Sequence, residues 1–217
     1  MSYRHFVNAL SFIVIASGLL VMVGWIFNIP TLKSVSSAWV PMRFITAICF
    51  VMSGLILFYI NKFICGETEI ATAVLPVASM IVLIFMFTFL ASQIFDISTG
   101  VEELVAKDIL GLDTGTTSNQ PSLIAVFNFV VIAFMGLITL LKLKYFKNLT
   151  STSGALVAAL GALGVAGYIF NIPFLYFNWG KLSMPIAFNT SVAFILAGVA
   201  LILLRKVEIN CSNTSAQ

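Results

Sequence analysis

Six long apolar runs divide the sequence, and they constrain the fold more than any other feature. A helix rises about 1.5 Å per residue, so each run is long enough to cross a hydrocarbon layer of about 30 Å. Backbone amides cannot stay unpaired in hydrocarbon, and the runs lack the polar alternation of barrel strands. We therefore predict an all-α integral membrane protein with six transmembrane helices. The runs cover approximately residues 6–27, 42–60, 70–92, 122–141, 154–172 and 185–204.

Composition supports a lipid environment for these helices. Of the 217 residues, 60% are hydrophobic and only 9% are charged, whereas a soluble domain carries roughly a quarter charged residues. Such a chain cannot cover its surface with polar groups, so its main partner is the lipid bilayer. The net charge of +3 is small and scattered, without the dense basic face that nucleic acid requires. We expect no nucleic-acid partner.

An internal repeat organises the helices. The segment Trp25–Pro30 returns as Tyr168–Pro173, and a fainter copy lies at Ile94–Ile97. The matches continue in Pro41–Ala47 with Pro185–Ser191, Phe50 with Phe194, and Gly54 with Gly198. We predict three copies of one helical hairpin with pseudo-threefold symmetry, over about residues 6–60, 70–141 and 154–205. Each copy is an apolar helix, an exit segment, an outer loop and a returning apolar helix.

The basic residues predict the orientation of the bundle. Cytoplasmic connections of membrane proteins carry an excess of Lys and Arg. With the N-terminus inside, one side holds Arg4, Lys62, Lys142, Lys144, Lys147, Arg205 and Lys206, and the other holds Lys33, Arg43, Lys107 and Lys181. We therefore expect a multi-pass protein of the inner or plasma membrane with both termini in the cytoplasm. Residues 1–206 form a single membrane domain, and 207–217 form a short polar tail.

The sequence offers few groups for catalysis or metal binding. Cys49, Cys65 and Cys211 lie far apart without metal-like spacing, which predicts isolated reduced thiols. The single histidine, His5, provides no axial pair for a haem inside the bundle. No nucleophile stands beside a histidine base, and no acidic pair lies inside the membrane. We predict no enzyme activity, no cofactor and no metal site.

Three polar residues occupy equivalent helix exits: Asn28, Asp96 and Asn171. One interpretation is structural, because Asn and Asp side chains satisfy backbone groups freed at helix ends, here with Pro30 and Pro173 as stop signals. The other interpretation is functional: the three groups converge around the pseudo-threefold axis and line an outward-opening pocket. Both interpretations remain open at this stage.

Arg43 is the sharpest ligand-binding candidate. A guanidinium in the outer leaflet is unfavourable without a partner, so it either reaches the headgroups or turns inward to Asp96 or to an anionic ligand. Further hydrogen-bonding groups on the same turns are Thr46, Asn189 and Thr190. Two aromatic candidates near the outer boundary, Trp25 and Tyr168, either anchor the bundle in the interface or stack on a ligand.

The segment Gly24–Val35, followed by Trp39–Phe50, resembles a family of membrane modules. These are the N-terminal six-helix sensory modules, akin to the MASE class, that precede PAS, histidine kinase or diguanylate cyclase domains in bacterial signalling proteins. Their pattern Met-x-x-Asn-Thr-Ala-x-x-Phe is kept as Asn189–Thr190, whereas Ile45 stands where Asn is usual before Thr46. The resemblance implies a sensory role rather than a particular ligand.

The chain departs from that family at its C-terminal end. After Arg205–Lys206 only the segment Val207–Gln217 remains, with no output domain. We therefore expect either a natural chain that acts through a separate partner or a sensor module detached from its output.

These observations predict a sensory or ligand-binding module for signal transduction. A small apolar or amphiphilic ligand would enter from the outer side, and the response would pass to a cytoplasmic or membrane signalling partner. One alternative is a small transporter or channel component working as a homo-oligomer, which the repeats favour. The other is an accessory subunit that binds a partner helix through the small residues of 154–172, such as Gly154, Ala158 and Ala162.

Overall fold

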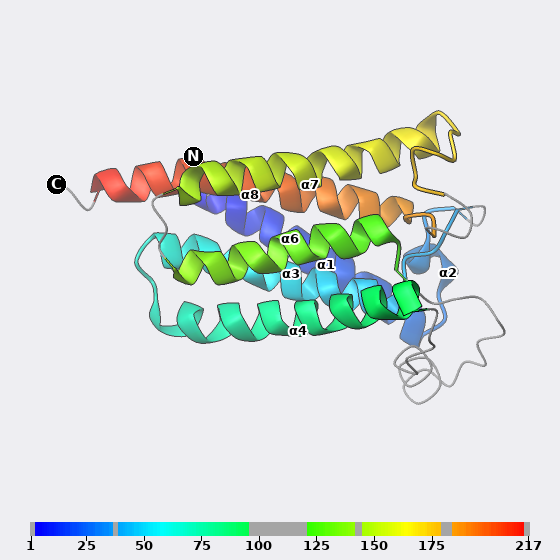
Figure 1. Cartoon of the computed structure of the whole chain (residues 1–217), viewed down its shortest axis with the longest axis horizontal. Coiled ribbons are helices and arrows are strands. Elements are labelled where there is room, and N and C mark those ends of the chain that lie inside the picture. The colour runs from blue at the N-terminus through cyan, green and yellow to red at the C-terminus, as the bar shows by residue number, and fades with distance from the viewer. Residues whose placement is uncertain (1–2, 37–38, 96–120, 142–144, 179–183, 215–217) are drawn as a thin grey trace.

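The structure is a computed structural model that describes residues 3–36, 39–95, 121–141, 145–178 and 184–214. Those residues form helices and turns, with no strand among them. The helices are α1 (Tyr3–Ile26), α2 (Pro30–Lys33), α3 (Phe44–Ile64), α4 (Glu69–Phe95), α6 (Leu123–Leu140), α7 (Phe146–Ile169) and α8 (Phe188–Thr214). Figure 1 shows the long helices side by side in one bundle.

The helices have the length and composition of membrane spans. Five of them, α1, α3, α4, α6 and α7, are long and apolar enough to cross a bilayer. The sixth apolar run, 185–204, lies largely within α8. The prediction of an all-α fold is confirmed for the described residues, and the five apolar helices are consistent with a membrane protein. The number of six spans, the three repeats and the orientation stay predictions.

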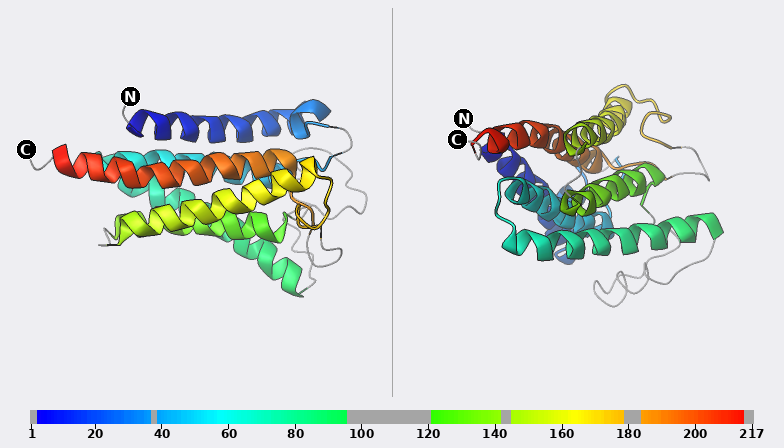
Figure 2. Two further views of the ribbon diagram at one scale, coloured as in Figure 1. Left: turned by 90° about the horizontal axis from the view of Figure 1, so that it is seen from above. Right: turned by 60° about the vertical axis from the view of Figure 1, so that its left-hand side comes forward.

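The chain ends lie together at one end of the bundle. Figures 1 and 2 show the start of α1 and the last turns of α8 at the same end, together with the turn between α3 and α4. We call this the inner end, after the predicted orientation. The opposite end, which holds α2 and the starts of α3, α6 and α8, is the outer end.

The centre of the bundle is α3. It packs against α1, α4, α6 and α8, and 67% of its most apolar segment is buried, against 28% in α1 and in α7. Fully buried Phe50, Phe129 and Phe194 come from α3, α6 and α8, and their ring centroids lie 4.8–4.9 Å apart. Such aromatic contacts add to apolar burial. Helices α3, α6 and α8, which all begin at the outer end, therefore share the core.

Glycines bring the paired helices close together. A Cβ at Gly161 of α7 would lie 2.7 Å from the carbonyl oxygen of Ser191 on α8, and one at Gly18 of α1 would lie 2.6 Å from that of Ala47 on α3. Small residues allow helix backbones to approach in membranes, where no hydrophobic effect drives them together. The positions match at offsets of 143 (18 to 161) and 144 (47 to 191).

Helices α7 and α8 extend furthest beyond the predicted runs. Helix α7 begins at Phe146, before the predicted run 154–172, and there the hydroxyls of Thr150 and Thr152 donate to carbonyls four residues earlier. Helix α8 continues through Thr214, although a polar tail was expected from Val207. Val207 is 1% exposed, so the apolar contact surface of α8 extends past the basic pair that precedes it.

The prediction of three isolated thiols is wrong for two of them. Cys65, at the end of α3, and Cys211, in the last turns of α8, form a disulfide with Cα atoms 5.4 Å apart. Cys49 is free and buried. The two cysteines are separated by 146 residues in the sequence, so no local pattern predicts their contact. Only the packing of α3 beside α8 at the inner end brings them together.

Candidate functional site

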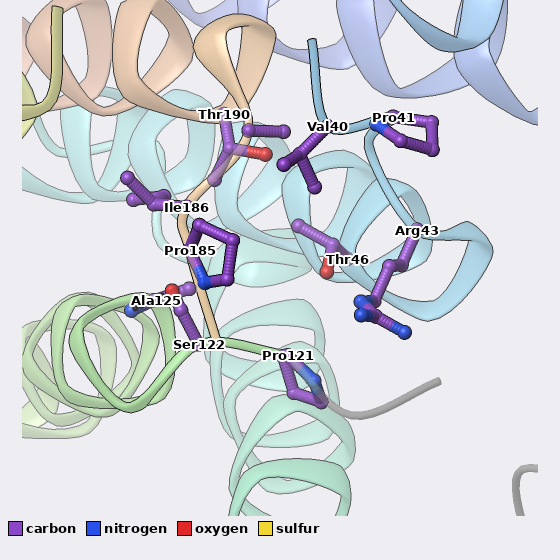
Figure 3. Close-up of a pocket in the computed structure, with 11 residues that line it drawn as sticks. Val40, Pro41, Arg43, Thr46, Pro121, Ser122, Ala125, Pro185, Ile186 and Thr190 are labelled. Carbon is purple, nitrogen blue, oxygen red and sulfur yellow. Dashed lines mark hydrogen bonds between the residues drawn. The ribbon is translucent and has the colours of Figure 1, made fainter. Parts of the chain in front are cut away.

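The starts of α3, α6 and α8 meet around one small space at the outer end. Figure 3 shows Thr46, Ser122 and Thr190 around it, with Arg43 at its edge. The described residues that line the space are Val40, Pro41, Arg43, Thr46, Pro121, Ser122, Ala125, Pro185, Ile186, Ala187 and Thr190. Each of the three predicted hairpins contributes to this lining through its returning helix.

Local sequence fixes where the three helices begin. A proline precedes each start, namely Pro41, Pro121 and Pro185, and proline disfavours continuation of a helix through it because it lacks an N–H and clashes with the preceding turn. Arg43 is the N-cap of α3, in extended conformation. Ser122 is the N-cap of α6, and its hydroxyl accepts a hydrogen bond from the Ala125 N–H at 3.2 Å. This is the usual side-chain cap of a helix start.

The converging helix starts give this space a positive character. The first N–H groups of a helix have no partner within the helix, and the helix dipole places partial positive charge there. The Arg43 guanidinium adds a full positive charge at the edge. Helix starts of this kind suit the oxygens of an anion. The arrangement can therefore receive an acidic group, and no acidic side chain is among the described residues that line it.

The space is narrow in this structure. Its volume is about 10 Å³, roughly what one water molecule needs. Small-molecule sites usually have volumes of several hundred Å³. Any organic ligand therefore requires the starts of α3, α6 and α8 to move apart.

The structure brings three of the predicted site residues together. Arg43, Thr46 and Thr190 all line the space. Thr46 is 4% exposed and Thr190 is 3% exposed, so both are shielded from solvent by the surrounding helices. Asn189, beside Thr190 in the sequence, is half-buried and does not line the space. Asp96 lies outside the described residues, and so does Ile97, whereas Ile94 and Phe95 are exposed at the end of α4.

Asn28 and Asn171 end helices and lie away from the space. Both are exposed and have left-handed backbones, with φ of 52° and 55°. The following N–H groups, of Ile29 and Ile172, donate to the carbonyls five residues earlier at 2.8 and 2.9 Å. Asn tolerates this conformation better than most residues, and the pattern is the Schellman ending of a helix. Their position fits the structural interpretation of these residues.

The side chain of Asn28 has a neighbour on the same loop. Lys33 Nζ donates to Asn28 Oδ1 at 2.7 Å and lies 4.4 Å from the centroid of the Trp25 ring. Partial burial lowers the pKa of Lys33. These contacts tie α2 to the end of α1.

Trp25 and Tyr168 brace the returning helices. Trp25 Nε1 donates to the Met42 carbonyl at 2.9 Å, and the Tyr168 hydroxyl donates to the Ile186 carbonyl at 2.8 Å. Met42 immediately precedes Arg43, and Ile186 itself lines the space. The two aromatics therefore position the segments that line the space, and neither ring is part of its lining.

An aromatic cluster joins the first and last hairpins at the outer end. The Trp39 ring lies 5.2 Å from that of Tyr168 and 4.7 Å from that of Phe188. Tyr176 stacks on Tyr168 at 4.8 Å. Edge and offset contacts of this kind stabilise by about 0.5–1.5 kcal/mol beyond area burial. They hold the loop before α3 against the start of α8, beside the space.

Sequence reasoning missed part of the lining. Ser122 and Pro121 belong to the least similar copy of the repeat, although a serine before an apolar run is a helix-start signal. Pro185 had a match in Pro41 but was not chosen as a site residue. Asn128 on α6 was also missed: it is fully buried, and its amide has no hydrogen-bond partner among the described residues.

Among the described residues, no group of three or more His, Cys, Asp or Glu side chains is placed to hold a metal ion. Comparisons with protein-family models, with curated proteins and with solved structures gave no match. What the chain does must therefore be inferred from its own residues.

Proposed function

We propose that this chain is a membrane-embedded sensory module that binds a small amphiphile with an acidic head group at the outer end. The binding site is the space between the starts of α3, α6 and α8. It performs no catalysis, and its output passes through a signalling partner at the inner end. The resemblance to bacterial six-helix sensory modules supports the role class, and the site chemistry supports the acidic head group.

One observation carries this proposal: three helix starts and Arg43 surround one space. The N–H groups of the helix starts and the guanidinium favour a carboxylate or phosphate in that space. The buried hydroxyls of Thr46 and Thr190 can donate further hydrogen bonds. The apolar lining from Ile186 and the prolines suits the first carbons of an acyl chain, whose remainder would lie in the membrane.

The small volume of the space links binding to a change in packing. A head group larger than water fits only if the three helix starts move apart. The ligand therefore binds the arrangement with separated helix starts and not the arrangement in this structure. A ligand shifts such an equilibrium only through different affinities for the two states. The starts of α3, α6 and α8 continue into the helices that share the Phe50, Phe129 and Phe194 cluster. A change at the starts therefore reaches the inner ends of the same helices.

The proposal includes six spans, three repeated hairpins and both termini in the cytoplasm. Matching contacts support the repeat for the first and last copies. Met42 N–H donates to the Lys33 carbonyl, and Ile186 N–H donates to the Tyr176 carbonyl, at sequence offsets of 144 and 143. The basic residues Arg4, Lys62, Lys147 and Arg205 at the inner end support the orientation.

The accessory-subunit alternative is less well supported. Part of its small-residue face is already used within the chain, since Gly154 and Ala158 pack against Gly198 of α8, and of the three residues predicted for that face only Ala162 is exposed. The transporter alternative is supported by the repeats, but the lining described at the outer end has space for only about one water molecule.

Thermal unfolding with charged and uncharged probes tests the site chemistry. The full chain in nanodiscs of zwitterionic lipid is titrated with decanoate and, separately, with decanol, which has the same chain length without the charge. We expect decanoate to raise the Tm and decanol to leave it nearly unchanged. In the Arg43→Ala variant the decanoate shift should be lost.

Lys33→Ala is the matched control, because it removes another cation of the outer end that does not line the space. This variant should keep the response to decanoate. Equal shifts with decanoate and decanol in the wild-type chain, or an unchanged decanoate shift in Arg43→Ala, would contradict the proposed site.

A further inference from the structure

A second cavity lies at the inner end, opposite to the proposed outer site. Its volume is about 310 Å³, at the lower limit of ordinary small-molecule sites. Residues from α3, α6, α7, α8 and the turn after α3 line it, among them Phe63, Thr68, Thr139, Phe146 and Glu208. Elements from all three predicted hairpins therefore meet around this cavity.

Glu208 is the only charged residue among the described residues that line this cavity. Its Oε2 atom is buried and has no hydrogen-bond partner. Leaving a carboxylate oxygen out of water without a partner is unfavourable. Burial raises the pKa of Glu208, and the nearby charge of Lys147 opposes that shift. Within the described part of the chain, no ion pair joins Lys147 to Glu208.

The remaining described lining suits an organic cation. Phe63 and Phe146 present aromatic surface, which attracts both apolar groups and ammonium ions. The Thr139 hydroxyl donates to the Met135 carbonyl at 2.7 Å, so its oxygen can still accept a hydrogen bond from a ligand N–H. Apolar walls with a few convergent polar groups are the usual design of small-molecule sites.

Other charged groups of the inner end are engaged elsewhere or lie outside the lining. Glu67 pairs with Arg4 and with Lys62, at 3.2 Å from the latter. Lys206 lies over the Tyr3 ring at 4.9 Å. None of these four side chains lines the cavity. The carboxylate of Glu208 therefore determines which charge the described lining selects.

We propose that the inner-end cavity is a binding site for a small organic ammonium ligand, with Glu208 as its counter-ion and Phe63 and Phe146 as its apolar walls. This site is independent of the outer-end site and of the function proposed for it. It selects a cation, whereas the outer site selects an acid.

Isothermal titration of the full chain in nanodiscs of zwitterionic lipid tests this proposal. The probes are phenethylammonium and phenethyl alcohol, which have the same aromatic body and differ in charge. Because the carboxylate of Glu208 is partly buried beside aromatic walls, we expect the ammonium to bind at least about tenfold more tightly than the alcohol. The Glu208→Gln variant keeps the shape of the side chain and removes its charge, so the preference for the ammonium should disappear.

Glu69→Gln is the matched control, since Glu69 lies at the same end, at the start of α4, and does not line this cavity. It should keep the preference of the wild-type chain. Equal or absent binding of the two probes to the wild-type chain would overturn the proposal without any variant. An unchanged preference in Glu208→Gln would overturn it as well.

Discussion

The first hairpin (α1 and α3) and the last hairpin (α7 and α8) are built alike in their outer halves. Trp25 and Tyr168 each donate a hydrogen bond to a carbonyl just before the returning helix. Gly18 and Gly161 each let the two helices of their hairpin touch at matching positions. These contacts use small residues and backbone groups, which form the same geometry despite different neighbouring side chains.

The two hairpins differ at their inner ends. In the first, Arg4 pairs with Glu67. In the last, Lys147 occupies the position 143 residues after Arg4, and the nearby Glu208 keeps a buried oxygen without a hydrogen-bond partner. The hairpins also differ at one outer position, where Arg43 corresponds to Ala187. The shared contacts form the scaffold, and the charged residue of each proposed site, Arg43 or Glu208, lies where the hairpins differ.

The largest expected effect comes from the covalent link between the two hairpins. The Cys65–Cys211 disulfide joins the inner ends of α3 and α8. Its reduction should lower the free energy of unfolding by about 2–4 kcal/mol, since a cross-link restricts the unfolded chain. Thermal unfolding with and without reductant measures this change. Cys65→Ser should already show the lower stability and should not respond further to reductant.

The same disulfide tests the orientation. Disulfides are rare in the cytosol, so with the inner end in the cytoplasm we expect Cys65 and Cys211 to be reduced in cells and to join on mild oxidation. Alkylation of free thiols in intact cells, followed by mass spectrometry, distinguishes the two states. A pair that is already oxidised in cells would argue for the opposite orientation.

The next effect concerns the close helix contacts that the hairpins share. Gly161→Leu and Gly18→Leu should each lower the free energy of unfolding by about 1–3 kcal/mol, because the added side chain forces the paired helices apart. Ala162→Leu is the matched control, since Ala162 is adjacent and exposed, and it should leave stability nearly unchanged. Unfolding in denaturing detergent measures all three. A neutral Gly161→Leu would contradict the close α7–α8 packing.

A smaller effect is expected from the two aromatic braces. Tyr168→Phe removes the hydrogen bond to the Ile186 carbonyl and should cost about 0.5–1.5 kcal/mol. Trp25→Phe removes the bond to Met42 and also leaves a gap, so its cost should be larger. Thermal unfolding of both variants compares them. If Tyr168→Phe is as stable as the wild-type chain, the brace does not contribute to folding.

The smallest effect is the pH dependence of the ion pair in the first hairpin. Hydrogen bonding from Arg4 and then from Lys62 holds the pKa of Glu67 below its ordinary value. The pair therefore stabilises the fold above the ordinary Glu pKa of about 4.3 and loses this contribution as the pH falls through the lower folded value. The Tm advantage of the wild-type chain over Glu67→Gln should be small, because the site is exposed, and should vanish in acid.

The sequence predicted the helices well because their apolar runs are long and uninterrupted. It placed their boundaries less well at α7 and α8, where polar residues continue the helix. Thr150 satisfies its hydroxyl within the helix, and Val207 remains in the core. Hydropathy reflects the free energy of moving a side chain from lipid to water, but it does not reflect these local contacts.

The candidate site was predicted only in part, for a physical reason. Arg43, Thr46 and Thr190 were predicted as site residues because a charged or hydroxyl side chain at the start of an apolar run is easy to recognise in a sequence. Ser122 was missed because its contribution depends on where α6 packs, which no local pattern encodes. Asn28 looked like a site residue, although its left-handed backbone explains its presence at a helix end.

The most direct test of the outer-end site is native mass spectrometry of the full chain purified in mild detergent. The proposed function predicts a small acidic adduct, in stoichiometric amount, on the wild-type chain and on Lys33→Ala, and its loss from Arg43→Ala. A bare wild-type chain, or an adduct that Arg43→Ala retains in full, would contradict the proposal that this space is the ligand site.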